Sequence, residues 1–111
     1  MTKLITDEMV EDALQYLAKS SELIAAARAM RLRAEFERKQ IRSRLFLSAE
    51  GTVAFKEAYS ESHADYVAAC QKEIEAAERD ELYRSERSTA ETIIEAWRTE
   101  SSNLRAGNSF K

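Results

Sequence analysis

The sequence predicts an all-α protein: a short N-terminal helix followed by a long antiparallel helical hairpin that resembles a coiled coil. Two observations support this fold class. The 111-residue chain has no proline and only two glycines, the residues that most often interrupt regular structure. Apolar residues also recur at helical spacing through most of the chain. Because paired helices have much surface and little core, we expect an oligomeric bundle, and the length fits one domain over residues 1–105.

The first predicted helix covers about residues 7–19. Thr6 or Asp7 can cap its N-terminus, and acidic side chains in the first turn suit the positive end of the helix dipole. An apolar stripe follows at helical spacing: Val10, Ala13, Leu14 and Leu17. Ser20 and Ser21 indicate a break and a new cap, although a continuous helix through both residues is left open.

The second predicted helix covers about residues 21–47 and carries two apolar lines, which is typical of burial on more than one side. One line contains Leu23, Ala27, Met30, Ala34 and Ile41, and the other contains Ala25, Ala29, Leu32 and Phe36. Residues 28–44 include seven basic and two acidic side chains, a net charge of +5. Gly51 then predicts a loop over residues 48–52, and a short helix is expected over residues 53–59.

The last predicted helix covers about residues 62–104. One line recurs every seven residues and alternates small with large side chains: Ala69, Ala76, Tyr83, Ala90, Trp97 and Leu104. Such a line favours close helix approach. Residues 73–100 contain four basic and nine acidic side chains, a net charge of −5. We therefore expect this helix to pair antiparallel with the basic one, with opposite charges setting the register. Residues 106–111 are expected to form a flexible tail.

The sequence offers no catalytic site, metal site or cofactor site. His63 and Cys70 are the only residues of their types, and seven helical residues separate them by about 10 Å, too far for a nucleophile–base pair. The carboxylates of Glu91 and Glu95 share a helix face, as they do on many solvated helices. No glycine-rich phosphate loop is present. We expect a non-enzymatic protein, and leave the roles of His63 and Cys70 open.

The amino-acid composition indicates where the protein is located and which partners are expected. A single cysteine suits a reducing cytoplasm, and no stretch approaches the roughly 20 apolar residues of a membrane helix. The net charge of −3 argues against a dedicated nucleic-acid-binding protein, which is usually basic. We therefore expect a cytoplasmic protein without a membrane partner.

The only tryptophan, Trp97, lies in the polar segment IIEAWRT. The simpler interpretation is a terminal core residue that closes the bundle. The alternative is an interface anchor, because Trp and Arg are enriched in binding hot spots. The predicted protein interface contains Ala69, Ala76, Tyr83, Ala90, Ile94, Trp97, Arg98 and Leu104.

The basic helix is the candidate for single-stranded DNA contact. Its predicted contacts are Arg28, Arg31, Arg38, Lys39 and Arg42, and Phe36 would add base stacking. The interpretation that we favour is that these cations pair with the acidic third helix, because the chain supplies its own counter-charges.

A set of residues also resembles a group of small phage- or prophage-encoded proteins with the C-terminal signature I-E-x-W-R-T-x-x-x-N-x-R. The matching residues are Ser21–Ala25, Ala27–Ala29, Glu35–Phe36, Arg38–Lys39, Tyr59, Tyr66, Ile94–Glu100, Asn103 and Arg105. This chain departs from the pattern of the group at two places. Its region around Gly51 is shorter, and Ser102 occupies a position where alanine is common. Such proteins are typically encoded near genes for single-strand annealing recombination. The resemblance implies an accessory or adaptor protein in a bacterial host, contacting a phage recombination or replication protein, and transfers no catalytic residue.

Overall fold

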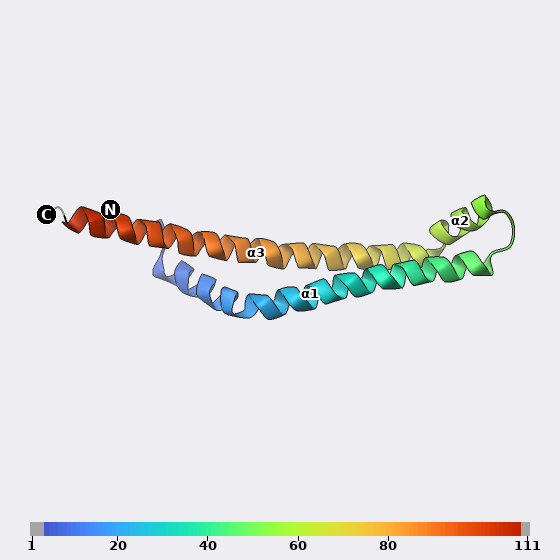
Figure 1. Ribbon diagram of the computed structural model, residues 1–111, viewed down its shortest axis with the longest axis horizontal. Coiled ribbons are helices and arrows are strands. Elements are labelled where there is room, and N and C mark those ends of the chain that lie inside the picture. The colour runs from blue at the N-terminus through green and yellow to red at the C-terminus, as the bar shows by residue number, and fades with distance from the viewer. Residues whose placement is uncertain (1–3, 110–111) are drawn as a thin grey trace. The chain divides into compact units, whose positions relative to one another are not determined.

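The computed structural model describes residues 4–109, which form three α-helices and no strand. Helix α1 covers Asp7–Ser48, α2 covers Val53–Ser62, and α3 covers Ala64–Ser109 (Figure 1). The predicted all-α fold is confirmed. Long apolar periodicity without proline gives α1 and α3 their length, since nothing inside either helix removes a backbone hydrogen bond.

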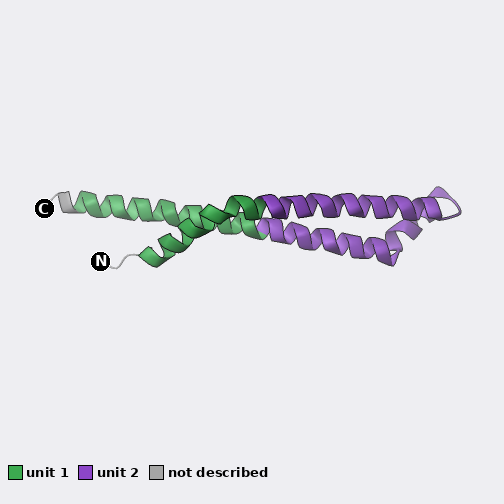
Figure 2. Cartoon of the chain, turned by 90° about the horizontal axis from the view of Figure 1, so that it is seen from below, with its two compact units in different colours: residues 1–24, 82–111 green, residues 25–81 purple. Residues whose placement is uncertain are grey.

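The chain divides into two compact units (Figure 2). Unit 1 contains residues 1–24 and 82–111, and unit 2 contains residues 25–81. Unit 2 is the closed end of the predicted hairpin, in which the second half of α1 runs antiparallel to the first part of α3, with α2 between them in sequence. Unit 1 pairs the beginning of α1 with the second half of α3.

Helix α1 runs without interruption through Ser20 and Ser21, so the alternative of a continuous helix holds and no boundary separates residues 7–19 from 21–47. The Ser20 side chain is 1% exposed, and its hydroxyl donates to the Leu17 carbonyl at 3.0 Å. A serine that satisfies its hydroxyl within its own helix does not need to cap a new one.

The predicted loop around Gly51 is confirmed. Gly51 has a φ of +127°, a backbone conformation that favours glycine. Thr52 then caps α2, because its hydroxyl accepts from the Phe55 N–H at 3.1 Å. Helix α2 ends at Ser62, three residues later than predicted, and the extended backbone of His63 separates it from α3.

The C-terminal prediction is wrong for residues 106–109, which continue α3 instead of forming a tail. Ala106 favours helix, and a Cβ at Gly107 would meet nothing within 4 Å, so this glycine sits in open space. A single exposed glycine costs about 1 kcal/mol and does not by itself end a helix. Residues 110–111 of the predicted tail lie outside the described residues.

The buried apolar core consists of small side chains: Val10, Ala13, Ala27, Ala34, Ala49, Ala69 and Ala90. On α1, Ala13, Ser20, Ala27 and Ala34 recur every seven residues, as Ala69, Ala76 and Ala90 do on α3 at multiples of seven. Small side chains at these positions let helix backbones approach closely. Alanines bury little surface, however, so this core contributes little hydrophobic stabilisation.

Candidate protein-interaction surfaces

Ion pairs connect the two helices of unit 2. Arg31 Nη1 lies 3.2 Å from Asp80 Oδ2 and 3.2 Å from Glu81 Oε1. Seven residues further along α1, Arg38 Nε pairs with Glu73, which lies seven residues before Asp80. Equal steps in opposite directions define an antiparallel register. The predicted pairing of the basic helix with the acidic helix is thus present at two successive heptads.

The electrostatics of this seam follow from these contacts. Hydrogen bonds to Asp80, and then to Glu81, raise the pKa of the Arg31 guanidinium, and the hydrogen bond to Glu73 raises the pKa of Arg38. The Asp80 side chain is only 3% exposed, whereas that of Arg31 is 43% exposed. Ion pairs in such a setting specify partner and register more than they add stability.

The residues predicted to contact single-stranded DNA are distributed over four environments. Arg31 and Arg38 lie in the seam against α3. Arg42 Nη2 pairs with Glu61 of α2 at 3.0 Å, and Lys39 Nζ pairs with Glu35 on α1 at 3.0 Å. Arg28 is exposed.

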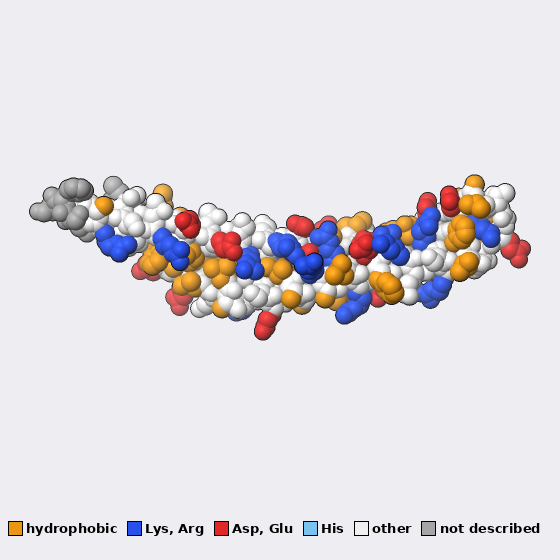
Figure 3. Space-filling view, in the orientation of Figure 1, with side chains coloured by type: hydrophobic (Ala, Val, Ile, Leu, Met, Phe, Trp, Pro, Cys, Tyr) orange, Lys and Arg blue, Asp and Glu red, His pale blue; other side chains and the backbone are white. Residues whose placement is uncertain are grey.

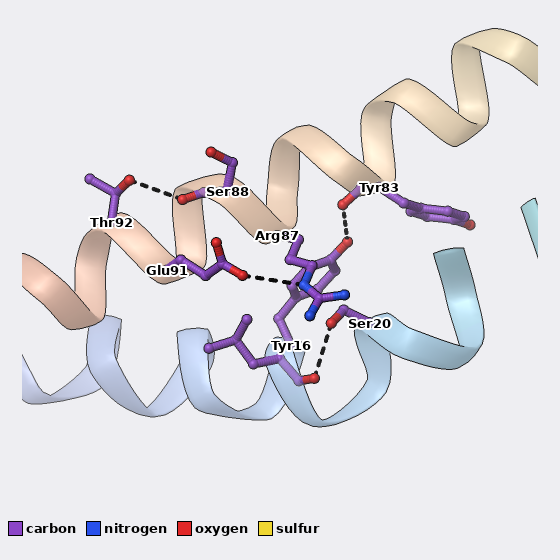
Figure 4. A network of polar contacts seen from close by, with 8 residues as sticks. Tyr16, Ser20, Tyr83, Arg87, Ser88, Glu91 and Thr92 are labelled. Carbon is purple, nitrogen blue, oxygen red and sulfur yellow. Dashed lines mark hydrogen bonds and ion pairs between the residues drawn. The ribbon is translucent and has the colours of Figure 1, made fainter. Parts of the chain in front are cut away.

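The alanine and aromatic line of α3 packs within the chain. Ala69 and Ala90 are buried. In unit 2, Ala76 shares a groove with alanines of α1, and in unit 1 Ala90 shares another with Ala13. The Tyr16 hydroxyl donates to the backbone carbonyl of Tyr83 at 2.7 Å, reaching from α1 to α3 (Figure 4). The three alanines of the predicted interface therefore pack against α1 within the single chain.

The other members of the predicted interface remain accessible to different degrees. Ile94 and Trp97 are half-buried, Arg98 is exposed, and Leu104 is 38% exposed. Nearby in unit 1, the Glu100 carboxylate accepts from the backbone N–H groups of Leu4 and Ile5 at 3.1 and 3.3 Å. Partial exposure leaves Trp97 able to close this end of the unit and to contact a partner. Sequence spacing gave no sign of the Glu100 contact, which joins residues far apart in the chain.

Many large apolar side chains are exposed, and others are half-buried. Side chains at least half exposed include Leu14, Met30, Leu32, Phe36, Leu47, Val53, Phe55, Val67, Ile74 and Leu82. Figure 3 shows apolar side chains scattered between charged ones and gathered over α2. The second apolar line of α1, which the sequence predicted to be buried, is therefore exposed. Where exposed apolar side chains are contiguous, they are candidates for an interaction surface.

Two other polar residues considered in the sequence, His63 and Glu91, have contacts within the structure. His63 Nδ1 accepts from the Asp65 N–H at 3.0 Å, and its ring lies edge-on to Tyr59 at 5.7 Å. Glu91 accepts from Arg87 Nε at 3.3 Å. Within residues 4–109, no group of three metal-ligating side chains comes together. In the same part of the chain, no helix combines the length and the apolar character needed to cross a membrane.

Comparison of the chain with protein-family models, with curated proteins and with solved structures found no match. The resemblance to small phage-encoded proteins remains a prediction from the sequence.

Proposed function

We propose that the protein is a non-enzymatic accessory or adaptor that acts through helical protein–protein contacts and associates with itself. The C-terminal segment resembles that of small phage-encoded proteins. We therefore propose that the protein acts in the recombination or replication of phage DNA in the bacterial cytoplasm. A recombination or replication protein of the phage would then be the second partner.

One observation carries the proposal: the fully buried core consists mainly of small side chains, while many large apolar side chains are exposed. The chain exposes 8399 Å², whereas a folded monomer of its mass exposes about 6,200 Å². The difference, on the order of 2,000 Å², is comparable to what one chain contributes to an obligate interface. Association would cover apolar surface that the chain alone leaves in water.

Light scattering and sedimentation of the purified protein test the proposal. We expect an oligomer. If Trp97 is a hot spot of its interface, Trp97→Ala should weaken the oligomer by about 2 kcal/mol or more. Trp97→Phe is the matched control, because it keeps an aromatic ring. Circular dichroism should show that both variants remain helical. A monomer at all concentrations, with an unchanged cooperative melt, would contradict self-association.

Single-stranded DNA binding is the second candidate. A shallow hollow on α1 is lined by an aromatic ring and two cations, together with two neutral polar side chains: Phe36, Lys39, Gln40, Ser43 and Arg44. Rings and cations in this arrangement suit base stacking and phosphate contact. Fluorescence anisotropy with a labelled oligonucleotide at low salt should then show binding that weakens with added salt. No binding at tens of micromolar protein would exclude this candidate.

A further inference from the structure

Unit 2 carries two exposed apolar stripes on opposite helices. The outer stripe of α1 contains Ala25, Ala29, Leu32, Phe36 and Leu47, and the outer stripe of α3 contains Val67 and Ile74. Phe36 is 61% exposed and Ile74 is 52% exposed. Each stripe lies on the side of its helix opposite the ion-paired seam, because its residues are about half a helical turn from the seam residues. The two stripes therefore face away from each other.

The two stripes have charges of opposite sign. Exposed cations flank the outer stripe of α1: Arg28, Arg33, Lys39 and Arg44. Exposed carboxylates accompany the outer stripe of α3: Glu75, Glu78 and Glu81. Two of these charges already have an ion-pair contact within the chain, Lys39 with Glu35 and Glu81 with Arg31, and both remain more than 60% exposed. The charged side chains of both stripes are therefore accessible to a partner.

This charge pattern selects the geometry of self-association. If the outer stripe of α1 met the same stripe of a second copy, four cations would face four cations. The outer stripe of α3 would likewise bring carboxylates together, and like-charge juxtaposition disfavours an interface. Contact between unlike stripes brings opposite charges together while covering apolar side chains on both sides. The hollow beside Phe36 offers space for an apolar side chain of the second copy.

We infer that the outer stripe of α1 in one copy binds the outer stripe of α3 in the next copy. This inference rests on the proposed self-association and adds its geometry. Because the two surfaces of each contact differ, the interface is heterologous, and every copy retains one free stripe of each kind. Such an interface produces a ring if the rotation between copies closes, or an open array if it does not. It does not produce a two-fold symmetric dimer.

Two blocking variants test this geometry. Phe36→Glu places a carboxylate in the outer stripe of α1, and Ile74→Glu adds one to the outer stripe of α3. Both positions are exposed and Glu favours helix, so each variant should keep its helical content in circular dichroism. Met30→Glu is the matched control, because Met30 is 50% exposed on α1 but lies beside the groove with Ala27 and Ala34.

Sedimentation of each variant alone and of their mixture gives the decisive measurement. At a concentration where the wild type is larger than a dimer, each blocked variant should sediment as a monomer, and Met30→Glu should behave as the wild type. An equimolar mixture of the two blocked variants should form a one-to-one dimer, because one variant keeps the α3 stripe and the other keeps the α1 stripe. High salt should shift the wild type toward smaller species.

Three outcomes would overturn the inference. A wild type whose mass stops at a dimer, or a mixture that stays monomeric, shows that the contact is not heterologous. Oligomers that persist in both blocked variants overturn the geometry and leave the proposed self-association intact. Loss of oligonucleotide binding in Phe36→Glu, with sedimentation unchanged, assigns the α1 stripe to nucleic acid instead.

Discussion

Units 1 and 2 share helices α1 and α3, yet different contacts connect these helices in each unit. In unit 2 the seam carries charged pairs, Arg31 with Asp80 and Arg38 with Glu73. In unit 1 the interhelical contact is neutral, a hydrogen bond from the Tyr16 hydroxyl to the Tyr83 carbonyl. Small side chains serve both units. The comparison indicates that small side chains permit close helix approach in both units, whereas in unit 2 ion pairs between α1 and α3 also set the register.

The largest expected loss of stability comes from replacing a buried alanine, a feature that both units share. Ala69→Phe in unit 2 and Ala90→Phe in unit 1 each place a ring at a position no more than 5% exposed. Overpacking of a close helix contact costs about 1–3 kcal/mol, and we expect the upper end in both units because the alanines are buried between helices. Urea denaturation measures the loss.

Ala68→Phe is the control for that substitution, because Ala68 precedes Ala69 on α3 but is exposed. Its stability should change little. Equal losses from Ala68→Phe and Ala69→Phe would mean that the alanine line is not the close-packed seam.

The second effect concerns the charged seam of unit 2. Asp80→Ala removes a nearly buried carboxylate that accepts from Arg31, and should cost about 1–3 kcal/mol. The cost stays within this range because the Arg31 guanidinium is 43% exposed and still contacts Glu81. Glu81→Ala, at a 68% exposed side chain, is the matched control and should cost less. An Asp80→Ala protein as stable as the wild type would show that the charged seam does not stabilise unit 2.

The third effect tests the neutral contact of unit 1. Burial, followed by the nearby Glu86 carboxylate, raises the pKa of Tyr16 above its ordinary value of 10.0. A raised pKa means that the folded state holds the phenol proton more tightly than the unfolded state. The associated stability is complete below pH 10 and is lost as the pH rises through the pKa of the folded state.

Tyr16→Phe should therefore lose about 1 kcal/mol near neutral pH, because the hydroxyl no longer donates to the Tyr83 carbonyl. Above pH 10 the difference from the wild type should shrink. Thermal melts at pH 8 and at pH 10.5 measure both changes. If the difference in stability between Tyr16→Phe and the wild type did not vary with pH, ionisation of Tyr16 would not be coupled to folding.

Sequence periodicity predicted the long helices, although the expected boundary at Ser20 and Ser21 is absent. Gly51 predicted the turn, and the charge balance predicted the antiparallel pairing. Periodicity did not identify the polar seam, because the line through Glu73 and Asp80 was hidden among the other acidic residues of α3. The carboxylate of Asp80 is buried only because Arg31 approaches from α1, and local spacing contains no information on such long-range contacts. The exposure of Leu32 and Phe36 was missed for a related reason, since an apolar line indicates burial against something without specifying whether the partner is the same chain.

The smallest expected effect separates local charge pairs from the interhelical ones. The side-chain hydrogen bond from Lys39, one turn away on α1, lowers the pKa of Glu35 below its ordinary value of 4.5. A lowered pKa contributes stability that is present above pH 4.5 and is lost as the pH falls through the pKa of the folded state. Lys39→Gln should remove only the stability that comes from the lowered pKa of Glu35. The melting temperature of this variant should therefore be slightly below that of the wild type at pH 7 and equal to it at pH 2.5. Both side chains are largely solvated, so screening by salt should erase the difference at pH 7 as well. If Lys39→Gln instead destabilised the protein as much as Asp80→Ala, the charges along α1 would act as one network, and the distinction between local and interhelical ion pairs would fail.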